Sequence, residues 1–219
     1  MSDDVRRESL EDRIRDQFPT VFITLVSVLV GLVLADLVAV ARARMVLWPL
    51  DPGTLRTWFE LAANTVSTLV AWIVYSHIAI SRRHIPSFAD ALIGFSLPFV
   101  LLIGTTFVGI RNAWPWFYFA SAFLALSYAS TIWLHRVMRL EQELATFGHL
   151  LRRDGYTSIF LLGAPFYLAV GVADQHGLLS LWLEDICAAV AAPSALLACH
   201  LFLRDWHYAI STAPAIEAE

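Results

Sequence analysis

The sequence lacks lysine altogether and carries few charged side chains of any kind. Its 15 basic residues are all arginine, 16% of its residues are charged, and its formal net charge is −4. Water-soluble domains carry about 25% charged residues. Because there is no excess of positive charge, we expect no binding to nucleic acid. The composition instead favours a chain that is surrounded mostly by lipid.

The sequence also has little cysteine and no motif of a catalytic or cofactor site. Cys187 and Cys199 lie in one apolar segment, about 18 Å apart if that segment is a helix with a rise of 1.5 Å per residue. They cannot form a disulfide with each other, because bridged cysteines lie within about 7 Å. No phosphate-binding loop, paired-histidine metallopeptidase motif or aspartyl dyad is found. We therefore expect no cofactor and favour a protein that is not an enzyme.

Long apolar segments are what the sequence has in abundance. The chain is 58% apolar, with a mean hydropathy of +0.63, and a transmembrane helix needs roughly 20 mostly apolar residues. We expect an all-α, polytopic integral membrane protein, a bundle of six transmembrane helices at residues 18–40, 58–80, 88–110, 115–138, 157–173 and 178–203. Segment 157–173 is short, so a hairpin that does not fully cross the membrane is the alternative for the last two helices.

The expected transmembrane domain, residues 18–208, leaves little chain outside it. Residues 1–17 form a tail in which a thin apolar stripe indicates a short interfacial helix. The first apolar segment is too long for the core of a signal peptide and has no clear cleavage site, so we expect it to remain as the first span. A helical stripe extends the fourth helix to about residue 153, and residues 209–219 form a flexible tail.

The arginines indicate the orientation of the bundle. If the N-terminus is inside the cell, eleven of the 15 arginines lie on the inner side, as the positive-inside rule requires. Trp48, Trp58, Trp114, Trp116 and Trp182 lie near the opposite boundary, where indoles prefer the membrane interface. We expect a multi-pass protein of the cell inner membrane with both termini in the cytoplasm.

Small residues mark an expected contact surface on the first helix. Ser27, Gly31, Ala35 and Ala39 recur at four-residue spacing, which lets another helix approach closely in lipid. We expect this face to pack within the bundle, and the alternative is an interface between subunits. The expected partners are therefore the lipid bilayer and either further copies of the chain or another membrane protein.

Polar residues form stripes on two other helices. Glu60, Asn64, Thr68 and Tyr75 share one side of the second helix, and Ser127, Thr131 and His135 share one side of the fourth. Such residues either bond to a neighbouring helix or line a hydrated path. Capping boxes, Thr57 with Glu60 and Ser87 with Asp90, are a structural alternative for the two acids. Our candidate path residues are Asp36, Glu60, Asn64, Asp90, Thr131 and His135.

Three histidines, His77, His135 and His200, each precede an arginine at the inner end of a helix. Imidazoles at one depth can bind a transition metal or carry protons, but histidines at a membrane interface also reach for lipid headgroups. We therefore expect no metal site and keep these three as weak candidates.

These patterns support three hypotheses for function. The first is a small ion channel or transporter, with a path lined by the polar faces of the second and fourth helices. The second is a membrane scaffold, sensor or accessory subunit of a larger complex. The third, an intramembrane enzyme acting on lipid, would depend on the inner histidines.

Overall fold

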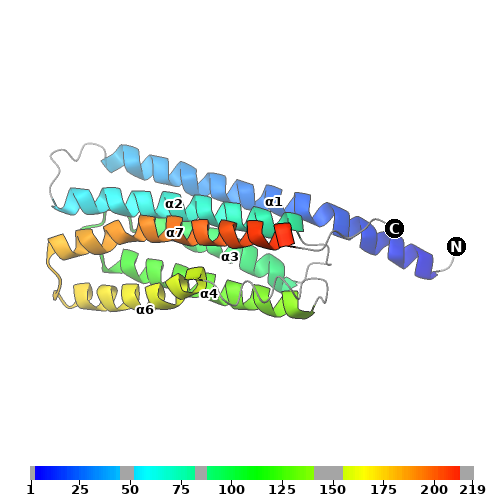
Figure 1. The fold of residues 1–219 in the computed structure, drawn as a ribbon. Helices are drawn as coiled ribbons and strands as arrows, with labels where there is room; N and C mark the ends of the chain where they lie inside the picture. The colour runs from blue at the N-terminus through cyan, green and yellow to red at the C-terminus, as the bar shows by residue number, and fades with distance from the viewer. Residues whose placement is uncertain (1–2, 45–51, 82–87, 141–154, 213–219) are drawn as a thin grey trace.

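The computed structural model describes residues 3–44, 52–81, 88–140 and 155–212. Within these residues the protein is all-helical, as predicted, with six helices (Figure 1): α1 (Asp3–Arg44), α2 (Pro52–Ser81), α3 (Phe88–Thr105), α4 (Trp114–Leu140), α6 (Gly155–Gln175) and α7 (Leu181–Thr212). Four of them contain stretches long and apolar enough to cross a membrane: Asp16–Arg44, Thr54–Ala79, Thr157–Gln175 and Leu181–Asp205. These helices fit a membrane protein, because lipid leaves backbone groups no partners except those within a helix or a closed barrel.

Helices α3 and α4 fall outside that set for different reasons. The apolar part of α3 that the structure describes, Leu92–Thr105, is short. Helix α4 is long enough, but its sequence is rich in Trp, Tyr, Ser and Thr, which lower its hydropathy. The expected extension of α4 to about residue 153 and the last part of the C-terminal tail, residues 213–219, lie outside the described residues.

The six described helices contact one another in a ring. Helix α1 packs on α2, α2 on α7, α7 on α6, α6 on α4, α4 on α3, and α3 back on α1, while α2 also touches α3. The most extensive contacts are those of α2 with α7 and of α4 with α6. Helix α1 lies along one edge of the bundle and reaches beyond the other helices at its N-terminus (Figure 1).

The two ends of the bundle differ. Helix α1 begins and α7 ends at one end, which we call the terminal end (Figure 1). The connections 106–113 and 176–180 lie at the other, which we call the turn end. Helix α6 stops there in a Schellman motif, in which Leu178 N–H donates to Ala173 O (2.9 Å), Gly177 N–H donates to Asp174 O (2.8 Å) and Gly177 has a φ of 67°. Residues 174–177 therefore form the turn that leads from α6 towards α7.

Helix α1 packs through a different face from the expected one. Its buried residues are large and apolar: Phe22, Val26, Val30, Val33 and Leu37. In the small-residue stripe, Gly31, Ala35 and Ala39 are exposed, and nothing lies within 4 Å of a Cβ built on Gly31. Only Ser27 of the stripe makes a described contact, accepting a hydrogen bond from Trp72 Nε1 (3.0 Å). Valine and leucine bury more surface than glycine and alanine, which explains why they face the core.

Candidate functional site: a central cavity closed at the turn end

A cavity of about 560 Å³ lies at the centre of the ring. It runs along α2 from Ala63 to Ala79 and is lined by residues of all six described helices, with α1 contributing only Phe18 and Phe22. Its volume falls within the range of about 300–1,000 Å³ that is usual for small-molecule sites. Among the described lining residues there is no Asp, Glu, Arg or His, so the wall that the structure describes is uncharged.

The polar faces of α2 and α4 meet in this cavity. Asn64 and Ser67 on α2, and Ser127, Ser130 and Thr131 on α4, all line it. The three hydroxyls on α4 donate to carbonyl oxygens of their own helix: Ser127 to Phe123 (2.8 Å), Ser130 to Leu126 (2.7 Å) and Thr131 to Ser127 (2.9 Å). Because each hydroxyl has one proton, these side chains offer the cavity only oxygen acceptors.

Asn64 presents the opposite chemistry. Asn64 is 8% exposed, and its Nδ2 atom is buried without a hydrogen-bond partner among the described residues. Thr68 Oγ1 donates to the backbone carbonyl of Asn64 (2.6 Å), not to its side-chain amide. The indole Nε1 of Trp133, another lining residue, is also buried and unpaired. A buried donor without a partner costs about 1–3 kcal/mol, so Asn64 is a residue that folding alone does not favour.

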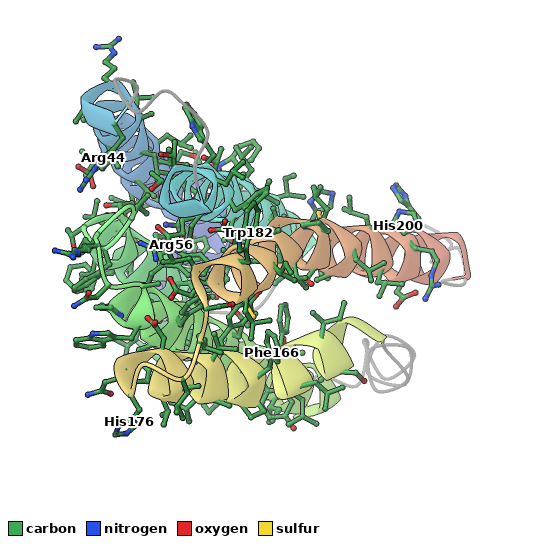
Figure 2. All side chains as sticks on the ribbon, turned by 90° about the vertical axis from the view of Figure 1, so that its left-hand side faces the viewer. Arg44, Arg56, Phe166, His176, Trp182 and His200 are labelled. Atoms are coloured by element: carbon green, nitrogen blue, oxygen red, sulfur yellow. The ribbon has the colours of Figure 1, made fainter. Side chains whose placement is uncertain are left out.

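Arg56 lies on α2 between the turn end and the cavity, whose lining on this helix begins at Ala63. Its side chain lies at the centre of the bundle when the structure is viewed from that end (Figure 2), and it is 3% exposed. Arg56 Nη1 pairs with Glu184 on α7, Nε lies 3.2 Å from Glu60 Oε1, and Nη2 donates to Ile110 O (2.5 Å). The guanidinium therefore joins α2, α7 and the connection between α3 and α4. We call Arg56, Glu60 and Glu184 the Arg56 cluster.

The connection between α3 and α4 is shaped to fit this cluster. Gly109 N–H donates to Glu60 Oε2 (2.7 Å), and Gly109 has a φ of 68°, a conformation that L side chains rarely adopt. A Cβ there would lie 2.8 Å from Thr57 Cγ2. Only glycine lets the backbone approach α2 closely enough to bond Glu60.

The roles expected for Glu60 and Arg56 need correction. Helix α2 begins at Pro52, so Thr57 lies inside it and cannot cap its first turn. Glu60 instead belongs to the buried ion pair. Arg56, which we expected in a connection before the second span, lies within α2 and is buried. The signal available in the sequence was the four-residue spacing of Arg56 and Glu60, which places both on one side of a helix.

The other candidate path residues are distributed as follows. Asn64 and Thr131 line the cavity, whereas Glu60 lies in the Arg56 cluster. Asp36 is not among the lining residues; it accepts a hydrogen bond from Thr105, which joins α1 to the end of α3. Asp90 lies in α3 and His135 in α4, but their side chains lie outside what the structure describes, as does Ser87.

The histidines do not form a described metal site. His77 has its Nδ1 atom 2.8 Å from Ile73 O, and its ring meets the edge of Phe202 at 6.4 Å between centroids. His200 is exposed on α7, on the outside of the bundle (Figure 2). In the part of the chain that the structure describes, no group of three or more His, Cys, Asp and Glu side chains is placed to hold a metal ion.

Comparison of the chain with protein-family models, with curated proteins and with solved structures gave no match.

Proposed function

We propose that this protein is a membrane carrier that moves a small solute through the central cavity, along the polar faces of α2 and α4. The observation that carries the proposal is the meeting of Asn64, Ser127 and Thr131 in one cavity, with a buried amide donor that has no partner among the described residues. A ligand that accepts a hydrogen bond from Asn64 Nδ2 would recover the free energy that the unpaired donor costs.

A carrier fits this geometry better than an open channel. The Arg56 cluster ties α2, α7 and the connection after α3 together at the turn end, so passage requires these segments to separate. The uncharged described wall offers no ring of charge to an ion. We infer alternating access, in which the cavity opens to one side at a time, and a neutral solute.

The proposed setting is the cell inner membrane, with six spans and both termini in the cytoplasm. Helix α3, with 18 residues, measures about 27 Å at 1.5 Å per residue, close to the hydrocarbon thickness of about 30 Å. Helix α4, with 27 residues, is longer than that thickness. In this orientation the arginine-rich side and the terminal end coincide, and the Arg56 cluster closes the outer side.

Flux into reconstituted vesicles tests the carrier. We expect wild-type vesicles to take up at least one member of a panel faster than protein-free vesicles, the panel being potassium, chloride, protons, glycerol, urea and a fluorescent monoacylglycerol. Ala195→Trp, which fills the cavity from α7, should abolish the flux. Leu196→Trp is the matched control, because Leu196 is 56% exposed and does not line the cavity. Vesicles that transport no member of the panel, or in which both variants behave alike, would overturn the proposal.

A second candidate function is that of a subunit in a larger membrane complex. The observation that favours it is the exposed face of α1 with Gly31, Ala35 and Ala39, which suits close contact with another transmembrane helix. That helix would come from a second copy of the chain or from another membrane protein. A defined complex isolated in mild detergent that Gly31→Leu disrupts would support this role, and a monomer unaffected by the substitution would remove it.

A further inference from the structure

We infer that the cavity binds a neutral, single-chain lipid with a hydroxylated or ester head, such as a monoacylglycerol, which enters sideways between α6 and α7. This inference rests on the proposed carrier function, since it names the class of solute that the cavity takes. It follows from three independent features of the cavity: where it opens, what charge its wall carries, and which hydrogen-bonding groups it leaves unused.

The cavity opens through the side of the bundle. Three large apolar residues that line it are also exposed on the surface of α6 and α7: Leu162 (68%), Phe166 (44%) and Val190 (47%). Figure 2 shows Phe166 on the side of α6 that faces α7. A side chain can line a cavity and remain exposed only where the cavity reaches the surface.

The helices on either side of this opening expose large apolar side chains. Besides the three lining residues, Leu161 and Leu168 on α6 and Leu196 and Leu197 on α7 are exposed. Both helices belong to the four that are apolar enough to cross a membrane. The opening therefore faces the hydrocarbon layer, and the molecules that can reach it are those dissolved in the bilayer.

The wall selects against charge and favours an apolar chain. No charged residue is found among the described lining residues, most of which are aliphatic or aromatic. A charged group of a ligand that entered this cavity without a partner would lose its hydration, at a large cost in free energy. The volume of about 560 Å³ holds on the order of 17–19 non-hydrogen atoms at about 30 Å³ each, the share of one water molecule. A glycerol ester of a ten-carbon acid has about this number.

The unused hydrogen-bonding groups describe the head of the ligand. Asn64 Nδ2 is a donor that needs an acceptor, which an ester carbonyl or a hydroxyl oxygen supplies. Ser127, Ser130 and Thr131 have committed their protons to their own helix and keep oxygen lone pairs. Those lone pairs accept hydrogen bonds from hydroxyl groups. An uncharged head that contains both an ester and hydroxyls can accept a hydrogen bond from Asn64 and donate hydrogen bonds to the hydroxyl oxygens of α4.

Photolabelling in lipid nanodiscs tests this inference. The probe is 1-decanoylglycerol with a diazirine in its acyl chain, and mass spectrometry locates the label. We expect saturable labelling of cavity-lining residues on α4, α6 and α7. Unlabelled 1-decanoylglycerol should compete, whereas 1-decanoyl-lysophosphatidate, with the same chain and an added phosphate, should compete at least tenfold more weakly.

Asn64→Leu supplies the discriminating variant. It should weaken labelling roughly three- to tenfold, as expected for the loss of one hydrogen bond. Its melting temperature without ligand should equal or exceed that of the wild type, because the variant removes a buried unpaired donor. Asn112→Leu, at an exposed position in the connection before α4, is the matched control and should label like wild type. Equal labelling of the Asn64 variant, or equal competition by the charged lipid, would refute the inference.

The labelling and the flux assays fail independently. If vesicles transport glycerol or urea while the probe shows no saturable labelling, the lipid ligand is wrong and the carrier stands. If the cavity is labelled saturably but no solute crosses, the binding site stands and the carrier is wrong.

Discussion

Arg56 and Asn64 are both buried polar residues of α2, but they differ in how their polar groups are paired. Arg56 is buried with its charge next to two carboxylates and with Nη2 donating to a backbone carbonyl. Asn64, two helical turns further along the same helix, is buried beside a cavity with no charged residue in its described lining, and its amide has no partner among the described residues. The first arrangement holds segments together, because one buried cation attracts carboxylates from two helices. The second leaves the Asn64 amide able to donate a hydrogen bond to a ligand.

Removing the arginine should destabilise the protein strongly. In Arg56→Met, the Glu60 and Glu184 carboxylates stay buried without their cation, and we expect a loss of about 3–5 kcal/mol in the free energy of unfolding. Titration with a denaturing detergent, monitored by circular dichroism, measures this loss.

The control is Arg111→Met, at an exposed position in the neighbouring connection, which should change stability by no more than about 0.5 kcal/mol. Adding Glu60→Gln and Glu184→Gln to Arg56→Met should recover part of the loss. Equal stability of the two arginine variants would show that the Arg56 cluster contributes nothing.

At the scale of the element, the sequence was a good guide to where helices form and a poor guide to which side of a helix packs. Long apolar segments predict helices, because a backbone in lipid has few other ways to pair its polar groups. The sequence did not reveal which face of α1 packs inside the bundle. Small residues that allow close contact and large residues that are buried both recur every three to four residues, so both patterns fit a helix face. Only the position of the neighbouring helices decides between Gly31 and Val33.

The same limit applies to the site. Asn64 and Thr131 were predicted from their polar stripes, and both line the cavity. The partnership of Arg56 with Glu184 was not predictable, because it joins helices α2 and α7 across 128 positions of sequence. The role of Gly109 depends in turn on that cluster. Local spacing reveals which residues share a helix face, but long-range pairing depends on how the helices assemble.

Two valines on α1 test which face packs. Val33 is fully buried and Val28 is 57% exposed. Val33→Ala should lower the free energy of unfolding by about 1–2 kcal/mol, since it removes two buried methyl groups. Val28→Ala should change it by less than about 0.5 kcal/mol. The measurement is the same detergent titration, with both variants in one series. A larger loss for Val28→Ala would mean that α1 is rotated relative to the arrangement described here.

For the whole molecule, the ring of helices and the closed turn end define a structure with two unlike sides. The proposed orientation puts the connections 106–113 and 176–180 outside the cell and the terminal end inside. Both described connections at the turn end are short, at eight and five residues.

Accessibility of single cysteines checks this orientation. In a background without Cys187 and Cys199, a cysteine at exposed His176 should react with a membrane-impermeant maleimide in spheroplasts, which leave the outer side of the inner membrane open to the reagent. A cysteine at Thr212, the last residue of α7, should react only after the inner membrane is permeabilised. The reverse pattern would invert the proposed topology, and reaction of both sites in sealed spheroplasts would mean that α7 does not cross.

The closed turn end also bears on the energy supply of the cell. An inner membrane stores its proton-motive force only if its proteins do not leak, and a wide cavity through the middle of a bundle is a potential leak. In the proposed carrier, a shut Arg56 cluster would let the cavity open on the other side without short-circuiting the membrane. Many copies could then stay in place without draining the voltage on which the cell depends.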